Sequence, residues 1–339
     1  MRAMILAAGY GTRLWPLTVD RTKPAIPFMG RPLVGYVAEY LAGQGVSEVV
    51  VNLHHRGESV RSALGDGSSF GVKLSYVEEP EILGTSGALD NARDFLESDT
   101  FIVVNGKIVT DIDLQSALRT HKESDALATL VLKENRKGER FSMVETRDGL
   151  VAGFGGMPAS DNPGDDARST NGASAREASK VPLMFTGIHI MEPRIFDYIP
   201  CGVASDTVID VYPKAIAGGE RIAAHVAGGT WYELSTIQRY LEISLIMLAR
   251  EGKDSVMGRN CAVHPQATIG ESVLWDKVTV EEGATAKRCV LGDLVRIARG
   301  EILENCAVVR AELVAGQEPP KKSLKGVVRG ENFVVPLGR

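Results

Sequence analysis

The N-terminal segment holds the residue types best suited to binding phosphate. The string LAAGYGTRLWPLT covers residues 6–18 and is followed by TKPAIPF at 22–28. Its glycines let backbone N–H groups close on phosphate oxygens, because glycine tolerates the required dihedral angles and adds no side chain. Arg13 and Lys23 add two positive charges. A single glycine turn could equally be a tight strand-to-helix connection, and the string is neither a P-loop nor a GxGxxG motif. The whole string nevertheless predicts a phosphate-binding loop.

Two other groups of polar residues are less specific. The turn LGTSGAL covers residues 83–89. By itself it fits a helix N-terminus capped by Thr85 or Ser86 as well as it fits contact with a ligand. His54 and His55 follow a predicted strand end, where neighbouring side chains point to opposite faces of the sheet. This geometry argues against a metal ion shared by the two histidines.

The order of the predicted elements indicates how the loop is positioned. Short apolar runs at 3–6, 49–53, 72–77 and 101–105 indicate strands. Residues 32–45 combine an initial proline, an apolar face and a final glycine, which is typical of a helix. Strands separated by helices imply parallel crossovers, so we expect an open, mostly parallel, Rossmann-like α/β sheet. Ligands of such sheets bind at the carboxyl ends of the strands.

The remainder of the chain divides into a loop, a strand, a helix and a region of different composition. Residues 159–180 contain no aromatic residue and no Ile, Leu, Val or Met. Such a segment cannot repay its own ordering entropy, so a flexible surface loop is predicted. A strand is predicted over 181–190 and an amphipathic helix over 237–250. We therefore expect one domain at 1–252 and a second at 253–339.

Apolar residues recur at six-residue intervals in the second domain. The clearest series are Val278, Ala284 and Val290, and Ile297, Leu303 and Val309. A period of six with Gly and Asn between the apolar positions is typical of a hexapeptide β-helix, although a small antiparallel sheet is the alternative. Roughly 55 residues at roughly 18 per coil give about three coils. We expect a separate module that supports homo-oligomer assembly rather than catalysis.

Together these strings resemble the sugar-1-phosphate nucleotidyltransferases, also called nucleotide-sugar pyrophosphorylases. The likeness is strongest to the mannose-1-phosphate guanylyltransferase branch, which carries a C-terminal left-handed parallel β-helix. It covers nearly the whole chain, through the blocks VVVNLHHRGE (49–58), GDGSSFGVKLSYVEE (65–79), LGTSGAL (83–89), VVNGKIVTDID (103–113), FTGIHIM (185–191) and WYELSTIQRYLE (231–242). The resemblance implies the nucleotidyltransferase fold. It also implies an enzyme that joins a nucleoside triphosphate (NTP) to a sugar 1-phosphate and releases pyrophosphate, with GTP and mannose 1-phosphate as the best guess.

The resemblance also implies which residues contact the substrates. The nucleotide would be bound by Leu6, Ala7, Ala8, Gly9, Gly11, Thr12, Arg13, Gly84 and Thr85. The sugar phosphate would be bound by Asn105, Gly106, Glu78, Gly187 and Glu233. Arg13, Lys23 and Lys107 would act on the phosphates during transfer. His264 resembles the base of β-helical acyltransferases, but three coils make a poor groove for acyl-CoA.

Three charged positions depart from the family pattern. Lys107 and Glu233 stand where the family has two aspartates that hold Mg²⁺, and Met157 stands where it has a lysine for the sugar phosphate. The charges of Lys107 and Glu233 sum to zero, as do those of two aspartates and Mg²⁺. An ammonium about 4 Å from a dication repels it by roughly 8 kcal/mol at an effective dielectric constant of about 20. We therefore expect no metal at this site, and we predict no cofactor. We expect Lys107 and Glu233 to form an ion pair near the α-phosphate.

These departures leave two functions open. One is a transferase in which Lys107 screens the α-phosphate in place of a metal. The other is a catalytically silent relative that binds a nucleotide sugar or a triphosphate and regulates a partner. A slipped alignment would make Lys107 a solvent-facing strand end, but the retained residues of NGKIVTDID around it argue against that interpretation.

The composition limits the class of partner. The chain has 339 residues, of which 44% are hydrophobic and 24% charged, which is an ordinary globular mixture. Its formal net charge of −5 provides no dominant positive field for nucleic acid. It lacks a run of about 18 apolar residues, so no membrane span is predicted. The four cysteines lack the spacing of a zinc site and indicate reduced thiols in a cytoplasmic protein.

Overall fold

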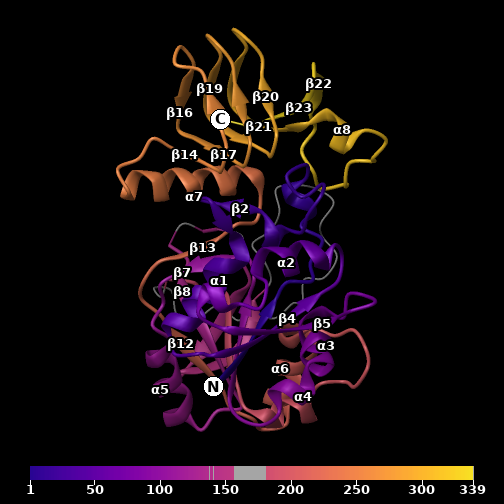
Figure 1. Cartoon of the computed structure of the whole chain (residues 1–339). Coiled ribbons are helices and arrows are strands. Elements are labelled where there is room, and N and C mark those ends of the chain that lie inside the picture. The colour runs from indigo at the N-terminus through magenta and orange to yellow at the C-terminus, as the bar shows by residue number, and fades with distance from the viewer. Residues whose placement is uncertain (137, 140, 156–180, 339) are drawn as a thin grey trace.

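The chain forms an α/β unit and a stack of β-coils. The computed structural model describes residues 1–136, 138–139, 141–155 and 181–338. In Figure 1 the α/β unit is the lower part, helix α7 (Ile237–Arg250) lies across its top, and the coils rise above that helix. The loop predicted at 159–180 lies outside the described residues, as does Met157.

Helices and strands alternate through the first part of the chain, and short strands follow α7. The strands are β1 (Arg2–Leu6), β2 (Pro27–Phe28), β3 (Arg31–Pro32), β4 (Glu48–Leu53), β5 (Lys73–Glu78), β6 (Phe101–Asn105), β7 (Ile108–Thr110), β8 (Ala128–Glu134), β9 (Met143–Arg147), β10 (Leu150–Gly155), β11 (Leu183–Met191), β12 (Ile222–Val226), β13 (Trp231–Glu233), β14 (Ser255–Met257), β15 (Ala262–Val263), β16 (Thr268–Gly270), β17 (Ser272–Leu274), β18 (Thr279–Val280), β19 (Thr285–Leu291), β20 (Arg296–Ile297), β21 (Ile302–Arg310), β22 (Val327–Arg329) and β23 (Asn332–Pro336). The other α-helices are α1 (Leu33–Gly43), α2 (Gly57–Leu64), α3 (Gly84–Asn91), α4 (Arg93–Leu96), α5 (Leu114–Ser124), α6 (Tyr212–Ala217) and α8 (Ala311–Val314).

The central sheet has nine strands in the order β5-β4-β1-β6-β11-β8-β12-β10-β9. β5, β4, β1 and β6 run parallel, as expected from the sequence, and β12 runs parallel to β8. β11 is antiparallel to both β6 and β8, and β10 is antiparallel to β12 and β9. The expectation of a mostly parallel sheet is therefore wrong, and the sheet is mixed. The antiparallel half includes the adjacent strands β9 and β10, which a short hairpin can join without a crossover helix.

Alternate residues of the central strands face two separate hydrophobic cores. In β1, Ala3 and Ile5 belong to one core and Met4 belongs to the other, as the two-residue period of a strand requires. Residues of α1, α2 and α5 fill the first core, while residues of α3, α4 and α6 fill the second. With helices packed on both faces, the ends of the strands are the place where an α/β sheet binds a ligand.

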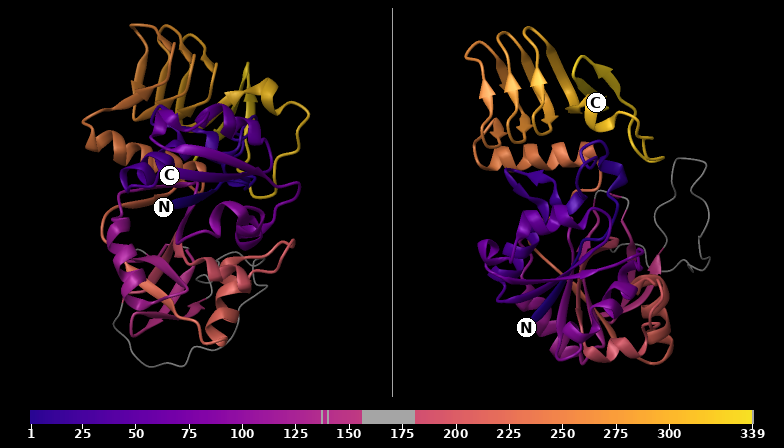
Figure 2. Two further views of the ribbon diagram at one scale, coloured as in Figure 1. Left: turned by 60° about the horizontal axis from the view of Figure 1, so that its bottom comes forward. Right: turned by 45° about the vertical axis from the view of Figure 1, so that its right-hand side comes forward.

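Beyond α7 the backbone coils with a constant repeat of 17 residues, so that Cys289 lies beside Cys306 of the next coil. Strands β14, β17, β19 and β21 stack in parallel as one side of the coils, and β15, β18 and β20 stack as another. Equivalent corners carry residues with positive φ, such as Lys277 and Leu294, and Gly283 and Gly300. The right-hand view of Figure 2 shows the coils side by side in a row above α7. The predicted β-helix is confirmed, and its parallel stacking excludes the small antiparallel sheet.

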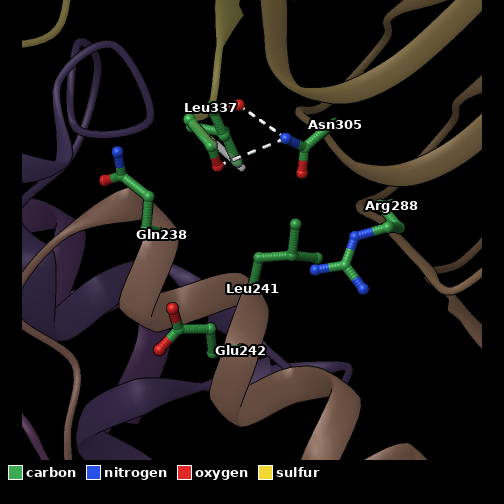
Figure 3. Close-up of a pocket in the computed structure, with 7 residues that line it drawn as sticks. Gln238, Leu241, Glu242, Arg288, Asn305 and Leu337 are labelled. Carbon is green, nitrogen blue, oxygen red and sulfur yellow. Dashed lines mark hydrogen bonds between the residues drawn. The ribbon is translucent and has the colours of Figure 1, made fainter.

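The last segment adds an antiparallel ending that the sequence does not predict. β23 pairs antiparallel with β21, and β22 pairs antiparallel with β23. The side-chain amide of Asn305 donates to the carbonyl of Leu337 at 2.5 Å and to that of Gly338 at 3.3 Å (Figure 3). The end of the chain is therefore fastened to the coils.

One hydrophobic core joins the coils to the α/β unit. It includes Trp15 and Phe28 of the N-terminal segment, Tyr240 of α7, and Trp275 and Phe333 of the C-terminal region. The ring centroids of Trp15 and Phe333 are 5.5 Å apart, and those of Phe28 and Tyr240 are 5.7 Å apart. The α/β unit alone would therefore expose these aromatic rings.

All four cysteines are free, with Cys289 and Cys306 buried and Cys201 exposed. Among the described residues, none of the helices is long and apolar enough to cross a membrane.

Candidate active site

A cavity of about 260 Å³ opens where the parallel strands end. Its lining contains most of the residues singled out from the sequence, namely Leu6, Ala7, Ala8, Gly9, Gly11, Lys23, Gly84, Thr85, Asn105, Gly106 and Lys107. The others that line it are Pro24, Asn52, Glu79 and Ile82. The fold therefore brings residues from four distant stretches of the chain to one place.

Three neighbouring strand ends fix the start of the phosphate-binding loop. Strand β1 lies between β4 and β6, so Leu6 is opposite Asn52 on one side and Asn105 on the other. The side-chain carbonyl of Asn52 accepts from the Ala7 N–H at 2.7 Å. The Gly106 N–H donates to the Leu6 carbonyl at 2.9 Å. The backbone of the loop is thus held on both sides before it turns.

The loop then passes close to Lys23. Gly11 has a φ of +66°, and a Cβ at this position would lie 2.8 Å from the Cβ of Lys23. Glycine is required here both by the backbone conformation and by the close approach. Burial, followed by the positive charge of nearby Lys107, lowers the pKa of Lys23 to about 7. A phosphate group in the cavity would favour the charged form of Lys23 again.

Lys107 and Glu233 form an ion pair at the edge of the cavity. Lys107 Nζ lies 3.1 Å from Glu233 Oε2, and the side chains are 30% and 11% exposed. Lys107 lies two residues beyond the end of β6, after Gly106, and β13 pairs with β7 so that Glu233 is opposite Ile108. The Leu234 N–H also donates to the Lys107 carbonyl at 3.1 Å. The expected salt-bridge reach is confirmed, and Lys107 is not a solvent-facing strand end, because it lines the cavity.

This pair does not fit the Mg²⁺ that the family resemblance implies. An ammonium group stands beside the single carboxylate of Glu233, at the distance of a direct ion pair. A dication about 4 Å from that ammonium would be repelled by roughly 8 kcal/mol at an effective dielectric constant of about 20. Within the described part of the chain, no group of three or more His, Cys, Asp or Glu side chains is arranged to hold a metal ion.

The turn at 83–89 is held from outside by a second segment. Helix α3 begins at Gly84, whose φ is +74° and whose Cβ would clash with the Ser205 carbonyl. The Thr85 hydroxyl donates to Asp206 Oδ2 at 3.0 Å and accepts from the Thr207 N–H at 2.8 Å. The Ser86 N–H donates to the Ser205 carbonyl at 3.0 Å. Thr85 therefore joins the cavity wall to the segment outside it and does not act as a simple helix cap.

The structure corrects the position expected for Glu78. That side chain is 63% exposed and pairs with Arg61 at 2.7 Å, away from the cavity lining. Its neighbour Glu79 is buried, accepts from Asn52 at 2.6 Å and from the Leu83 N–H at 3.1 Å, and lines the cavity. Adjacent side chains at the end of β5 point to opposite sides. An assignment that is wrong by one residue therefore selects the side chain that points away from the cavity.

Asn52 is the functional candidate that sequence reasoning missed. It is 3% exposed, and its amide joins the first residue of the loop to Glu79. A buried side-chain amide needs hydrogen-bond partners. The asparagine that follows three valines in VVVNL is the signal that could have revealed it.

A few predicted residues lie beside the cavity and not in its lining. Thr12 and Arg13 belong to a short 3₁₀ helix that follows Gly11, and the Arg13 side chain is exposed. Gly187, with a φ of +79°, packs against the side-chain amide of Asn105, where a Cβ would clash. Gly187 therefore supports Asn105 from behind.

A larger cavity, of about 530 Å³, lies between α7 and the coils (Figure 3). It is lined by Gln238, Leu241, Glu242, Arg288, Asn305, Leu337 and Gly338. It contains no residue of the glycine-rich loop and neither of the two lysines. The smaller cavity is therefore the candidate active site.

Comparison with known proteins supports this assignment. The family model described as nucleotidyl transferase matches residues 2–250, which include every residue of the smaller cavity. The chain belongs to this family. A second model, described as GlmU-like, C-terminal hexapeptide, matches residues 235–307.

Relatives of this nucleotidyl transferase include enzymes named for different nucleotides and sugars. The chain is 32% identical to a UTP–glucose-1-phosphate uridylyltransferase of Synechocystis sp., over 83% of the chain and 72% of the relative. It is 26% identical to a mannose-1-phosphate guanylyltransferase of Mycobacterium tuberculosis, over 84% of the chain and 83% of the relative. The crystal structure of HddC from Yersinia pseudotuberculosis aligns with a TM-score of 0.59 at 22% identity, over 73% of the chain and 99% of HddC. That last likeness shows the fold.

Proposed function

We propose that this nucleotidyl transferase joins the nucleotidyl group of an NTP to a sugar 1-phosphate and releases pyrophosphate. The observation that carries the proposal is the cavity in which the glycine-rich loop, Lys23 and Lys107 meet. Backbone N–H groups and two amines around one cavity suit the concentrated negative charge of a triphosphate. The names of three relatives, each a sugar-1-phosphate nucleotidyltransferase, support the class of substrate.

In the proposed reaction a phosphate oxygen of the sugar 1-phosphate attacks the α-phosphorus of the NTP. As the new P–O bond forms, the bond between the α-phosphorus and the oxygen bridging to the β-phosphate breaks. The electron pair of that bond leaves with pyrophosphate. Positioning and charge stabilisation account for most of such catalysis, so the step needs no nucleophile from the protein.

The loop and the two lysine side chains would contact different phosphate groups of the NTP. The segment from Gly9 to Thr12, with Arg13 beside it, would hold the leaving pyrophosphate, and Gly84 and Thr85 would contact the nucleoside. Lys23 would contact the phosphates as charge builds up in the transition state. We assign to Lys107 the screening of the α-phosphate, with Glu233 holding the ammonium in place at 3.1 Å.

The sugar phosphate would bind on the β6 side of the cavity. Asn105 and Gly106 line this side, and Gly187 fixes the position of the Asn105 amide. Glu79 takes over the place first given to Glu78, since it is Glu79 that faces the cavity. We propose GTP and mannose 1-phosphate as the substrates, on the overall likeness to guanylyltransferases such as that of M. tuberculosis.

Three further properties belong to the same proposal. We infer a left-handed sense for the β-helix, from the resemblance to the guanylyltransferase branch. We infer a homo-oligomer formed through the coils, because hexapeptide modules of this family commonly associate. We infer a cytoplasmic location, where NTP is available and the four thiols stay free.

A turnover assay tests the transferase directly. Purified protein is incubated with each of the four common NTPs and a panel of sugar 1-phosphates, and released pyrophosphate is measured with and without excess chelator. Pyrophosphate release that needs both substrates supports the proposal. Nucleotide binding without turnover on any pair would favour the silent regulatory relative.

A binding experiment tests the assignment of the loop. Replacing Arg13 or Lys23 by Ala removes a charge-assisted contact worth about 1.5–3 kcal/mol, so NTP affinity should fall by roughly tenfold or more. Lys253→Ala is the matched control, because that lysine pairs with Glu251 at 2.7 Å far from the cavity. Unchanged affinity in both loop variants would remove the basis of the assignment.

A further inference from the structure

The segment between Gly11 and Phe28 leaves the cavity, touches the coils and returns. At its start it follows the glycine-rich turn, and near its end Lys23 lines the cavity. Between these points Trp15 packs on Phe333, and Arg21 reaches the coils. Two residues after the contact at Arg21, the chain places Lys23. A shift of the contact is therefore transmitted to the lysine through very little backbone.

The contact at Arg21 is an ion pair with two acidic partners. Arg21 Nη2 donates to Asp293 Oδ2 at 2.6 Å, and the same guanidinium donates to Asp20 at 2.8 and 3.0 Å. Its carbon lies 5.2 Å from the centre of the Trp275 ring. The side chains of Arg21 and Asp293 are 21% and 25% exposed, so water screens the pair only in part. Although burial opposes the charge, the hydrogen bonds to Asp20 and then Asp293 raise the pKa of Arg21.

A hydrogen bond from the preceding coil fixes the Asp293 side chain. Its Oδ1 accepts from the Asp276 N–H at 2.9 Å, while its Oδ2 accepts from Arg21. Both carboxylate oxygens are thus engaged, one by the coils and one by the N-terminal segment. Asp293 joins the two parts of the molecule as a single rigid link.

A second link enters the same segment at its far end. Trp275 Nε1 donates to the Tyr240 hydroxyl at 3.1 Å, and that hydroxyl donates to the Pro27 carbonyl at 2.6 Å. Two successive hydrogen bonds therefore connect the coils, through α7, to the N-terminal segment at Pro27. In the chain, Lys23 lies between the ion pair at Arg21 and the hydrogen bond at Pro27.

Lys23 needs such support because its surroundings oppose its charge. Burial, Lys107 and Arg13 all disfavour the ammonium form, and Glu233 offsets them only in part. An unsupported segment would relieve this repulsion by moving the amine toward solvent. Fixing the backbone on both sides of Lys23 prevents that movement.

We propose that the β-coils position Lys23 for the transfer reaction through the Asp293–Arg21 ion pair, so that Asp293, though outside the cavity, is a positioning residue of the active site. The inference rests on the proposed function, since it assigns a role to a group that acts on the NTP. It gives the C-terminal region a part in catalysis beyond assembly.

The test compares two coil variants of the full chain. Asp293→Asn removes the charge that faces Arg21. Glu281→Gln is the matched control, because it breaks an ion pair of the coils, with Arg296 at 2.5 Å, that does not touch the N-terminal segment. Each variant is assayed well below its melting temperature, and kcat and the KM for each substrate are determined separately.

We expect kcat to fall at least tenfold in Asp293→Asn and to stay within twofold of wild type in Glu281→Gln. In Arg21→Met kcat should fall by a similar factor. The kcat of the double variant Arg21→Met/Asp293→Asn should be no lower than that of the less active single variant, because both substitutions break the same ion pair. Asp293→Glu, which keeps the charge, should recover most of the loss.

Two outcomes would overturn the inference. One is a wild-type enzyme with clear turnover whose Asp293→Asn variant keeps kcat within twofold. The other is a double variant that loses the product of the two single factors, which would mean independent effects. Absence of turnover in the wild type would instead refute the proposed function. The positioning role is then judged by calorimetry with the NTP, where equal affinity in wild type and Asp293→Asn refutes it.

Discussion

Replacing Lys107 by Met should abolish most of the transferase activity. The change removes one charge of the pair in which Lys107 Nζ lies 3.1 Å from Glu233 Oε2. At an effective dielectric constant of about 20, two unit charges at this distance attract by about 5 kcal/mol. Removing Lys107 has two effects, because it takes a cation from the phosphate site and leaves the largely buried Glu233 carboxylate facing an anionic substrate.

The two effects can be separated by a second substitution. In Lys107→Met/Glu233→Gln both charges are gone and no carboxylate opposes the phosphates. What remains missing is the contact between the ammonium and the α-phosphate, and a charge-assisted hydrogen bond of about 1.5–3 kcal/mol corresponds to a loss of roughly 10- to 150-fold in kcat/KM. The single variant should lose more than this, and the double variant should lose about this amount.

The assay is pyrophosphate release under steady-state conditions, with circular dichroism to check that each variant is folded. Lys253→Met serves as the control for loss of a lysine, since its partner Glu251 lies at 2.7 Å in a remote surface pair. A double variant with wild-type kcat/KM would refute the reasoning, because Lys107 would then serve only to neutralise Glu233. A related pair of changes, Lys107→Asp with Glu233→Asp, should make activity more sensitive to chelator than that of the wild type.

Four other predictions concern Lys23, the C-terminal region and Gly187. At pH 8 the binding of NTP should take up close to one proton, because the pKa of Lys23 is lowered to about 7 in the free protein and rises beside phosphate; calorimetry in buffers of different ionisation enthalpy should show this uptake in the wild type and not in Lys23→Met. For the same reason stability should rise with pH from about 7 to about 10, since the unfolded lysine holds its proton over this range and the folded one does not; chemical denaturation across this range should show a flatter profile in Lys23→Met. A chain cut after Gly252 should lose cooperative thermal unfolding, because it exposes the aromatic core shared with the coils; a folded fragment with full nucleotide affinity would contradict this. Gly187→Ala should displace Asn105 and raise the KM for the sugar phosphate on the order of a hundredfold, with a much smaller change in the KM for NTP.

Local patterns predicted the elements of the fold well. The strand expected at 101–105 is β6 (Phe101–Asn105), and the helix expected at 237–250 is α7 (Ile237–Arg250). The strand expected at 72–77 is shifted by one residue in β5, and the helix expected at 32–45 is shorter at both ends in α1. Periodicity identifies an element by its buried face, whereas its ends depend on local hydrogen bonds that composition does not show.

Long-range arrangement was beyond the sequence pattern. The insertion of β11 antiparallel between β6 and β8 depends on which strand edges remain open after the first strands have paired. The packing of Trp15 on Phe333 joins residues at opposite ends of the chain. Neither arrangement leaves a local signal, because an apolar residue is equally apolar whichever partner it meets.

The candidate site was predictable to the extent that its residues follow strand ends. Gly9, Asn105 and Lys107 meet in the cavity because parallel strands end at one edge of the sheet, whereas Lys23 reaches it from a short 3₁₀ helix. The sequence could not show whether Glu78 or Glu79 faces the cavity. Consecutive side chains at the end of β5 point to opposite sides, so a shift of one residue in the alternation changes the answer. Asn52 was visible as a polar residue in an apolar run, and only its contacts show that it joins the loop to Glu79.

The constant coil of 17 residues restricts how this region can change during evolution. An insertion or deletion of one codon inside a coil side would move every later side chain of that side to the opposite face, exchanging buried and exposed positions. It would also move the corner residues with positive φ, such as Lys277 and Leu294, out of step with one another. Gain or loss of a whole coil avoids both effects. Lengths of the C-terminal region among close homologues should therefore differ in steps of one coil, with other insertions confined to the corners.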